Sequence, residues 1–210
     1  MSTTRVQIGP ADAGRAMTLD EFREADEEPG YLYELARGIL EVVEVPGDAH
    51  GQIVHNINVL FTRYLLRHPG PILRIAHGSD LRLIATEPDT DRHPDLAVVF
   101  RGAARNARGR QLPRLVVEVV SPGAKARKRD YQDKADDYLR IGIEEYWVVD
   151  PDPRRLTVHV RRADGDRAHW DQRTFEHDQA VESELLPDFR ATVADFWAHV
   201  DAEENPEADA

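Results

Sequence analysis

The sequence predicts a single α/β domain in which a β-sheet is flanked by helices. Short apolar runs rich in valine, isoleucine and leucine recur along the chain and have the length of buried strands. Between these runs lie segments whose apolar residues fall at helical spacing. No internal repeat or linker divides the 210 residues, and this length suits one well-buried domain.

The N-terminal part of this domain combines a short helix, two strands and a longer helix. The TLDE motif at residues 18–21 has the form of a capping box and predicts a helix to about Ala25. Residues 31–45 predict two short strands joined at Arg37-Gly38. Residues 50–66 have apolar side chains at helical spacing, and the HPGP sequence that follows ends this helix.

The remainder of the chain predicts more strands and two further helices. Strands are expected at residues 72–76, 81–85, 95–100, 115–120, 146–149, 156–160 and 168–175. Asp130 is a plausible N-cap for a helix that ends at Gly142, and residues 193–200 predict a terminal helix. We expect residues 1–16 to form a flexible arm, residues 17–200 the single domain, and residues 201–210 a disordered acidic tail.

Composition excludes several classes of function. No run approaches the roughly 18 apolar residues of a membrane span, and the N-terminus lacks the pattern of a signal peptide. The chain has no cysteine, which excludes disulfides and thiol nucleophiles. It also lacks a G-x-S-x-G motif and a phosphate-binding glycine loop. We therefore expect a cytoplasmic protein with no membrane partner.

Charge is spread unevenly along the chain. The formal net charge is −12, which argues at first against a nucleic-acid partner. Residues 101–129 nevertheless contain seven arginines and two lysines against a single glutamate, a local balance of +8. An acidic protein can approach phosphate through one basic segment, although a solvated loop explains the same charges. The candidate nucleic-acid-binding residues are Arg105, Arg108, Arg110, Lys125 and Lys128.

Two carboxylates are predicted to face each other at one end of the sheet. Asp95 begins one strand and Glu118 interrupts the apolar run LVVEVV near the end of the next. An antiparallel pair would place the start of the first strand beside the end of the second. A carboxylate on a mostly buried strand is costly unless it is paired or coordinates a cation. The alternatives are that Asp95 is a turn residue and that Glu118 forms a buried ion pair with Lys134.

Lys134 is predicted to reach the same place from the following helix. All three lysines of the chain lie within residues 125–134, whereas the chain has 24 arginines. On a helix that begins near Asp130, Lys134 shares the less polar stripe with Tyr131 and Tyr138. Two carboxylates and a lysine are suited to a hard divalent cation that activates water for attack on a phosphodiester. A lysine that only covers a tyrosine would show the same pattern.

The order of these motifs resembles a known family. HPDLAVV at residues 93–99, LVVEVVSP at 115–122, DYQDK at 130–134 and EYWVVDP at 145–151 are similar to the Uma-type family of "putative restriction endonucleases", within the PD-(D/E)XK nuclease superfamily. YELARGIL at 33–40 and the later His50-Gly51 also match, so the resemblance covers about Met17 to Phe196. The resemblance implies a restriction-endonuclease-like mixed sheet flanked by helices.

The resemblance also implies roles for individual residues. Asp95 and Glu118 would be metal ligands, Lys134 the catalytic lysine and Glu34 a further carboxylate of the site, with Mg²⁺ as cofactor and Mn²⁺ able to substitute. The lysine of the superfamily tripeptide would stand at position 120, which is valine here. The family moves this lysine to the next helix, where Lys134 stands. An exposed strand glutamate remains the alternative for Glu34.

The expected function is that of a metal-dependent endonuclease that hydrolyses DNA phosphodiester bonds. The alternative is a non-catalytic nucleic-acid-binding or assembly module on the same fold, which the negative net charge favours. A homodimer, or a protein partner that supplies DNA affinity, would reconcile that charge with a DNA substrate.

Overall fold

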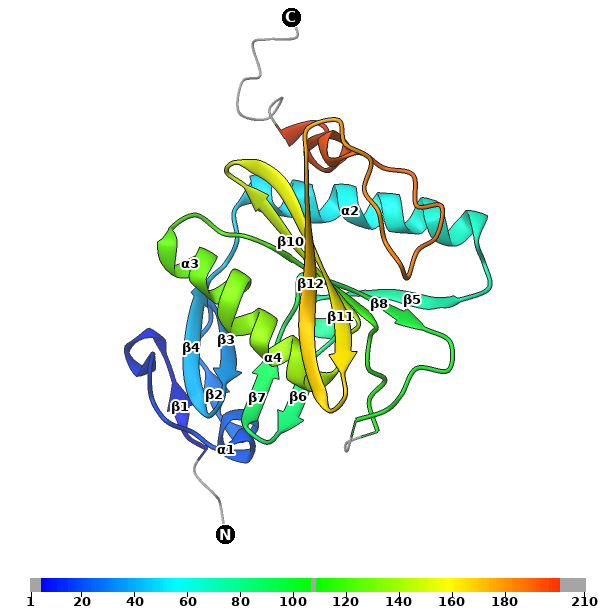
Figure 1. Ribbon diagram of the computed structural model, residues 1–210. Coiled ribbons are helices and arrows are strands. Elements are labelled where there is room, and N and C mark those ends of the chain that lie inside the picture. Colours follow the sequence, from blue (N-terminus) through cyan, green and yellow to red (C-terminus); the bar gives the residue numbers. More distant parts are fainter. Residues whose placement is uncertain (1–4, 107–108, 201–210) are drawn as a thin grey trace, which may run out of the picture.

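The computed structural model describes residues 5–106 and 109–200, in which two main sheets lie side by side with helices packed against them (Figure 1). Among the described residues the larger sheet has six strands in the order β12-β11-β10-β9-β8-β5. Its strands are β5 (Ile72–His77), β8 (Leu96–Phe100), β9 (Leu115–Val119), β10 (Glu145–Pro151), β11 (Arg154–Asp164) and β12 (Arg167–Glu176).

Neighbouring strands of this sheet run antiparallel except at its centre. Strands β9 and β10 are parallel, and parallel neighbours need a crossover connection. Here the crossover contains α3 (Ala124–Lys128), a π-helical turn η3 (Arg129–Asp133) and α4 (Lys134–Ile141), which form one continuous helical segment. Gly142 ends it in the left-handed conformation, as its position in the sequence predicts.

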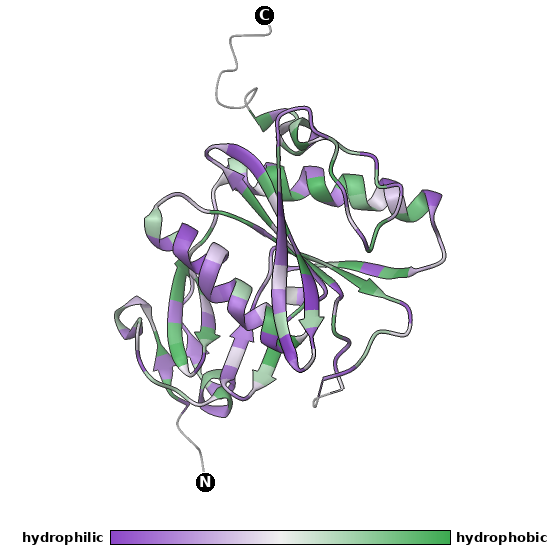
Figure 2. Cartoon of the chain, in the orientation of Figure 1, coloured by the Kyte–Doolittle hydropathy of each residue, from purple (hydrophilic) through white to green (hydrophobic). Residues whose placement is uncertain are grey.

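The two faces of the six-stranded sheet bury different clusters. One face packs on α2 (Asp48–Arg67) and on the 3₁₀ helix η4 (Val193–Trp197), with Val117 and Val119 pointing into this core. The other face packs on α4, with Val116 and Val120 pointing towards it. Figure 2 shows the central strands as mainly hydrophobic and the crossover helix as largely hydrophilic. Glu118 lies between Val116 and Val120 and therefore faces the crossover.

The smaller sheet supports the crossover from the other side. Its strands are β4 (Ile39–Glu44), β3 (Tyr31–Ala36), β7 (Asp89–Arg92) and β6 (Leu83–Thr86), in that spatial order. One face buries an apolar cluster with α1 (Leu19–Glu24), and Leu35 and Leu40 contribute to it. The other face carries Glu34 and Arg92, whose side chains meet residues of α4.

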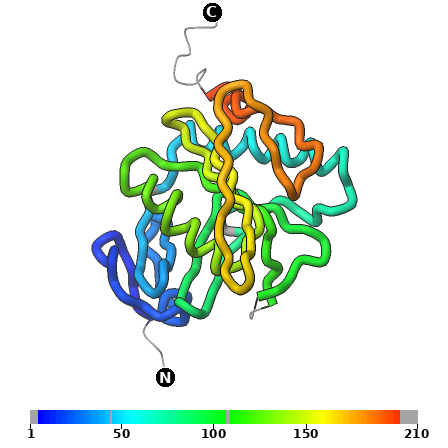
Figure 3. The backbone as a smooth tube through the Cα atoms, in the orientation of Figure 1, coloured from blue at the N-terminus to red at the C-terminus, as the bar shows by residue number. Residues whose placement is uncertain are grey.

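The predicted mixed α/β fold with flanking helices is confirmed, but some predicted elements are wrong. The N-terminal residues 5–16 are not a loose arm, because β1 (Gln7–Ile8) pairs with β2 (Asp26–Glu27) and the Ile8 side chain is fully buried. The chain path in Figure 3 shows this segment against the small sheet. The acidic tail predicted at residues 201–210 lies outside the described residues.

Two local predictions are also corrected, and one strand was not predicted. Asp130 does not cap a helix, because it lies inside the helical segment and is buried. Residues 193–197 form a 3₁₀ helix, η4, where an α-helix was expected. The strand β7 was missed because its sequence DTDR carries three charges and no apolar residue. None of the helices within residues 5–106 and 109–200 combines the length and the apolar composition of a membrane-spanning helix.

Candidate active site

The four residues predicted to form a site come from both sheets and from the crossover. Glu34 lies on β3, Asp95 directly precedes β8, Glu118 lies on β9, and Lys134 is the first residue of α4. The predicted antiparallel pairing is confirmed, since Leu96 of β8 lies opposite Val117 of β9. The structure therefore brings all four residues to one end of the strand pair.

Lys134 joins the two sheets through buried ion pairs. Its Nζ lies 2.9 Å from Glu118 Oε1 and 3.2 Å from Glu34 Oε1. All three side chains are at most 4% exposed. One turn further along α4, the Tyr138 hydroxyl donates a 2.5 Å hydrogen bond to the same Oε1 of Glu118. The lysine is thus neither a surface residue nor a cover for a tyrosine, and its ammonium is fixed between two carboxylates.

Asp95 is the more accessible carboxylate of the site. Its side chain is 21% exposed, and its Oδ2 accepts a 2.7 Å hydrogen bond from the Val119 amide. Its Oδ1 lies 3.1 Å from Nε2 of His50, in the first turn of α2. Asp95 and Glu118 line one cleft of about 40 Å³ together with Lys134. Both carboxylates therefore reach a space that opens to solvent.

Burial and neighbouring charges shift the pKa values of Glu118, Glu34 and Lys134 in the cleft. Burial raises the pKa of Glu118 to about 8, and the carboxylates of Asp95, Asp130 and Glu34 add to this effect against the opposing charge of Lys134. Burial also raises the pKa of Glu34, but Lys134 and Arg92 outweigh it and lower the pKa to about 2. Burial disfavours the charged form of Lys134, yet its neighbouring carboxylates raise its pKa above the ordinary value. The lysine therefore stays protonated at neutral pH.

The donor set of this cleft fits a hard cation that keeps part of its water shell. Among the described residues, no group of three or more histidine, aspartate or glutamate side chains is placed to hold a metal ion. Mg²⁺ commonly binds through one or two carboxylates, with water and substrate phosphate completing its coordination. Asp95 and Glu118 supply two such carboxylates, and a cation beside them would favour the charged form of Glu118, which burial and the neighbouring carboxylates disfavour.

A buried arginine that sequence reasoning missed fixes Glu34. Arg92 is fully buried, and its NH1 lies 3.0 Å from Glu34 Oε2 and 2.6 Å from Glu41 Oε2. Its NH2 lies 2.8 Å from Asp137 Oδ2 on α4, one turn beyond Lys134. The polar strand that carries Arg92 has no apolar alternation that could have signalled a buried residue. Arg92 ties the small sheet to α4 and so holds Glu34 against Lys134.

The sequence matches a family model along most of its length. The model of the Uma2 family, described as "putative restriction endonuclease", matches residues 19–194. The chain belongs to this family. A crystal structure from Anabaena variabilis ATCC 29413, titled a putative nuclease of the DUF820 family, superposes with a TM-score of 0.65 at 18% identity. The superposition covers 88% of this chain and 99% of that chain, and it shows that the fold is shared. No curated protein matches the sequence.

The basic residues predicted to bind nucleic acid lie at two different ends of this Uma2-family protein. Arg105 and Arg110 are exposed in the connection between β8 and β9. This connection lies at the opposite end of the strands from Asp95, about 17 Å away for a five-residue strand. Arg108 lies outside the described residues. Lys125 and Lys128 are exposed on α3, which follows β9 at the end that carries the carboxylates.

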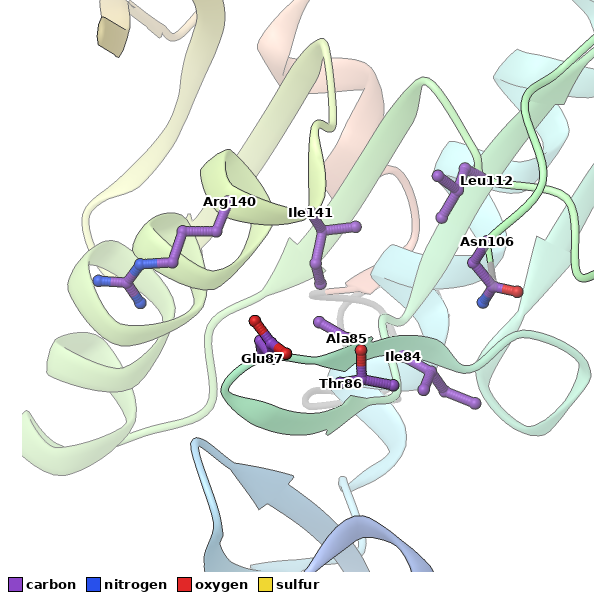
Figure 4. Close-up of a pocket in the computed structure, with 8 residues that line it drawn as sticks. All are labelled: Ile84, Ala85, Thr86, Glu87, Asn106, Leu112, Arg140 and Ile141. Atoms are coloured by element: carbon purple, nitrogen blue, oxygen red, sulfur yellow. The ribbon is translucent and has the colours of Figure 1, made fainter. Parts of the chain in front are cut away.

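A second pocket, of about 270 Å³, lies between the β6–β7 hairpin, the β8–β9 connection and the end of α4 (Figure 4). It is lined by Ile84, Ala85, Thr86, Glu87, Asn106, Leu112, Arg140 and Ile141. Figure 4 shows that the Arg140 side chain extends away from Ile141, and its NH1 lies 3.4 Å from Asp137 Oδ1. Of the described lining residues, Glu87 alone is a carboxylate. The described lining of this pocket therefore lacks the paired carboxylates of the cleft.

Proposed function

We propose that this Uma2-family protein is a metal-dependent endonuclease that hydrolyses DNA phosphodiester bonds in the cleft of Asp95 and Glu118. The observation that carries the proposal is the position of Lys134, whose Nζ lies 2.9 Å from Glu118 beside a cleft that Asp95 also lines. A carboxylate pair with an adjacent ammonium is an arrangement suited to phosphoryl chemistry. The family match supports the nuclease assignment.

In this proposal Asp95 and Glu118 would hold Mg²⁺, and Mn²⁺ could replace it. A bound Mg²⁺ supplies Lewis acidity and lowers the pKa of a coordinated water. Lys134 cannot serve as a general base at neutral pH, because its raised pKa keeps it protonated. Its roles are to fix the orientation of Glu118 and to offset negative charge that develops on the phosphoryl group. Glu34 orients the ammonium from the opposite side.

A non-catalytic nucleic-acid-binding module is a second candidate, and two observations favour it. The net charge of −12 disfavours DNA affinity, and the ammonium of Lys134 is already engaged by Glu34 and Glu118. In that case the Lys134 cluster would serve only to join the two sheets. A second copy of the chain or another protein would supply the missing affinity for DNA.

Metal titration separates the two candidates. Mg²⁺ or Mn²⁺ would be titrated into the wild type and into Glu118→Gln, with calorimetric heat and nicking of supercoiled plasmid followed in parallel. The endonuclease proposal expects saturable heat and nicking in the wild type and the loss of both in the variant. Glutamine keeps the size of Glu118 and removes its charge, so the fold should persist. Metal heat without nicking under any condition would favour the binding module.

A further inference from the structure

The π-helical turn brings a second cation into the cleft. In a regular α-helix, residues five apart point about 140° away from each other around the axis. The backbone amide of Lys134 instead donates to the carbonyl of Arg129, five residues earlier, which is the π-helical pattern. This bond places Arg129 and Lys134 on the same side of the segment. Arg129 accordingly lines the cleft together with Asp95 and Glu118.

The guanidinium of Arg129 is held on one edge only. Its Nε and NH2 donate to the two carboxylate oxygens of Asp130 at 2.9 Å and 3.3 Å. Asp130 is buried, and its side chain makes no other hydrogen bond to a described residue. The side chain of Arg129 is 17% exposed, and its NH1 makes no hydrogen bond within the described part of the chain. The paired edge fixes the group, and NH1 keeps donors to spare on a residue that lines the cleft.

The other lysine and histidine side chains of the cleft each already face a carboxylate of the protein. Lys134 is engaged by Glu118 and Glu34. The Nε2 of His93 lies 3.7 Å from Asp91 Oδ1. His50 is directed at Asp95. Among the described residues that line the cleft, Arg129 is therefore the cation with donors to spare.

We propose that Arg129 binds a phosphate oxygen of the nucleic-acid backbone at the cleft, and that Asp130 is the positioning residue that orients it. The inference rests on the proposed function and adds a substrate contact to it. An arginine fork suits this task because its planar donors match the tetrahedral oxygens of a phosphate. Its fixed conformation also reduces the side-chain entropy lost on binding.

The test measures DNA binding separately from cleavage. Affinity for a short fluorescein-labelled duplex would be followed by anisotropy with Ca²⁺ in place of Mg²⁺, over a series of salt concentrations. Arg129→Gln should weaken DNA binding about tenfold. It should also make the slope of log affinity against log salt concentration shallower by about one released counterion. The matched control is Arg127→Gln, two residues earlier, where the arginine is held by Asp150 and does not line the cleft. The control should bind like the wild type.

A double variant excludes a purely structural role for Arg129. If the arginine only neutralised Asp130, Arg129→Gln would lower the melting temperature, and adding Asp130→Asn would restore both stability and binding. The proposal expects stability to recover in the double variant while DNA affinity stays low. Wild-type affinity in the double variant would overturn the inference, as would a wild type that binds no DNA. If the wild type binds DNA through Arg129 but never cleaves it, the proposed endonuclease activity is refuted and the proposed contact between Arg129 and phosphate is kept.

Discussion

Replacing Lys134 by methionine tests the site most directly, because the side chain serves both stability and the proposed chemistry. Methionine keeps most of the apolar stem of the buried lysine but removes its charge. The loss of the ammonium leaves Glu34 and Glu118 without a shared partner in a region that is almost fully buried. We expect the variant to lose plasmid nicking completely and to retain metal binding.

The size of the stability loss follows from the two carboxylates. Burial raises the pKa of Glu118 to about 8, so this group is already mainly protonated at pH 7 and leaves no stranded charge when the ammonium is removed. Glu34 has a pKa lowered from 4.5 to about 2, which corresponds to about 3 kcal/mol of favourable interaction. Lys134 and Arg92 share this stabilisation. Since breaking a buried ion pair typically costs about 3–5 kcal/mol, we expect a loss of about 3 kcal/mol, at the lower end of that range.

Urea unfolding of three proteins would check this magnitude. The double variant Lys134→Met/Glu34→Gln should recover part of this stability, because glutamine leaves no unpaired charge at position 34 and Arg92 keeps its ion pairs with Glu41 and Asp137. It should still not cleave DNA, so that stability and activity separate. Lys134→Arg serves as a further control, since the broader guanidinium does not fit the space of a compact ammonium. A folded Lys134→Met protein that nicks plasmid at the wild-type rate would refute the catalytic role.

Three further predictions concern metal, DNA and pH. Mn²⁺ should raise the melting temperature of the wild type but not of Asp95→Asn, whose amide oxygen can still accept the Val119 amide; an equal rise would place the metal elsewhere. Charge reversal at Arg105 and Arg110 should weaken DNA binding less than reversal at the two α3 lysines, as salt-dependent anisotropy would show. Burial lowers the pKa of His159 to about 4, so as the pH falls below about 6.5 this histidine is protonated in the unfolded chain before it is protonated in the folded protein. Between pH 7 and pH 4.5 the free energy of unfolding, measured in urea, should therefore fall by about 2–3 kcal/mol, and this fall should be absent in His159→Gln. An equal fall in both proteins would contradict the lowered pKa of His159.

The sequence predicted Glu118 because a charged residue is conspicuous within the apolar pattern of a buried strand. Glu118 stands out in LVVEVV, since the alternation of a strand assigns it to one face and burial makes its charge costly. The same periodicity cannot reveal Arg92, because its strand is polar throughout and its burial depends on three carboxylates from other elements. The π-helical turn was also missed, since one additional residue within a helix leaves no mark on composition.

The N-terminal segment shows a different limit of sequence reasoning. Residues 5–16 contain only two large apolar residues, Val6 and Ile8, and these form no helical or strand pattern long enough to predict order. They become ordered because Ile8 enters the cluster under the small sheet and because their backbone pairs with β2. Contacts of this kind depend on a surface that exists only after the rest of the domain has folded.

The parallel pairing of β9 and β10 has a consequence for how such sites can change in evolution. A chain that leaves one strand and returns to its parallel neighbour must pass over one face of the sheet, and the hand of that passage is almost invariant. In this protein the returning segment covers the face to which Glu118 points. A lysine lost from the strand could therefore be replaced from this segment without any change in topology. The connectivity of the sheet thus provides a second position in the chain, on the crossover segment, from which a lysine ammonium can reach the same site.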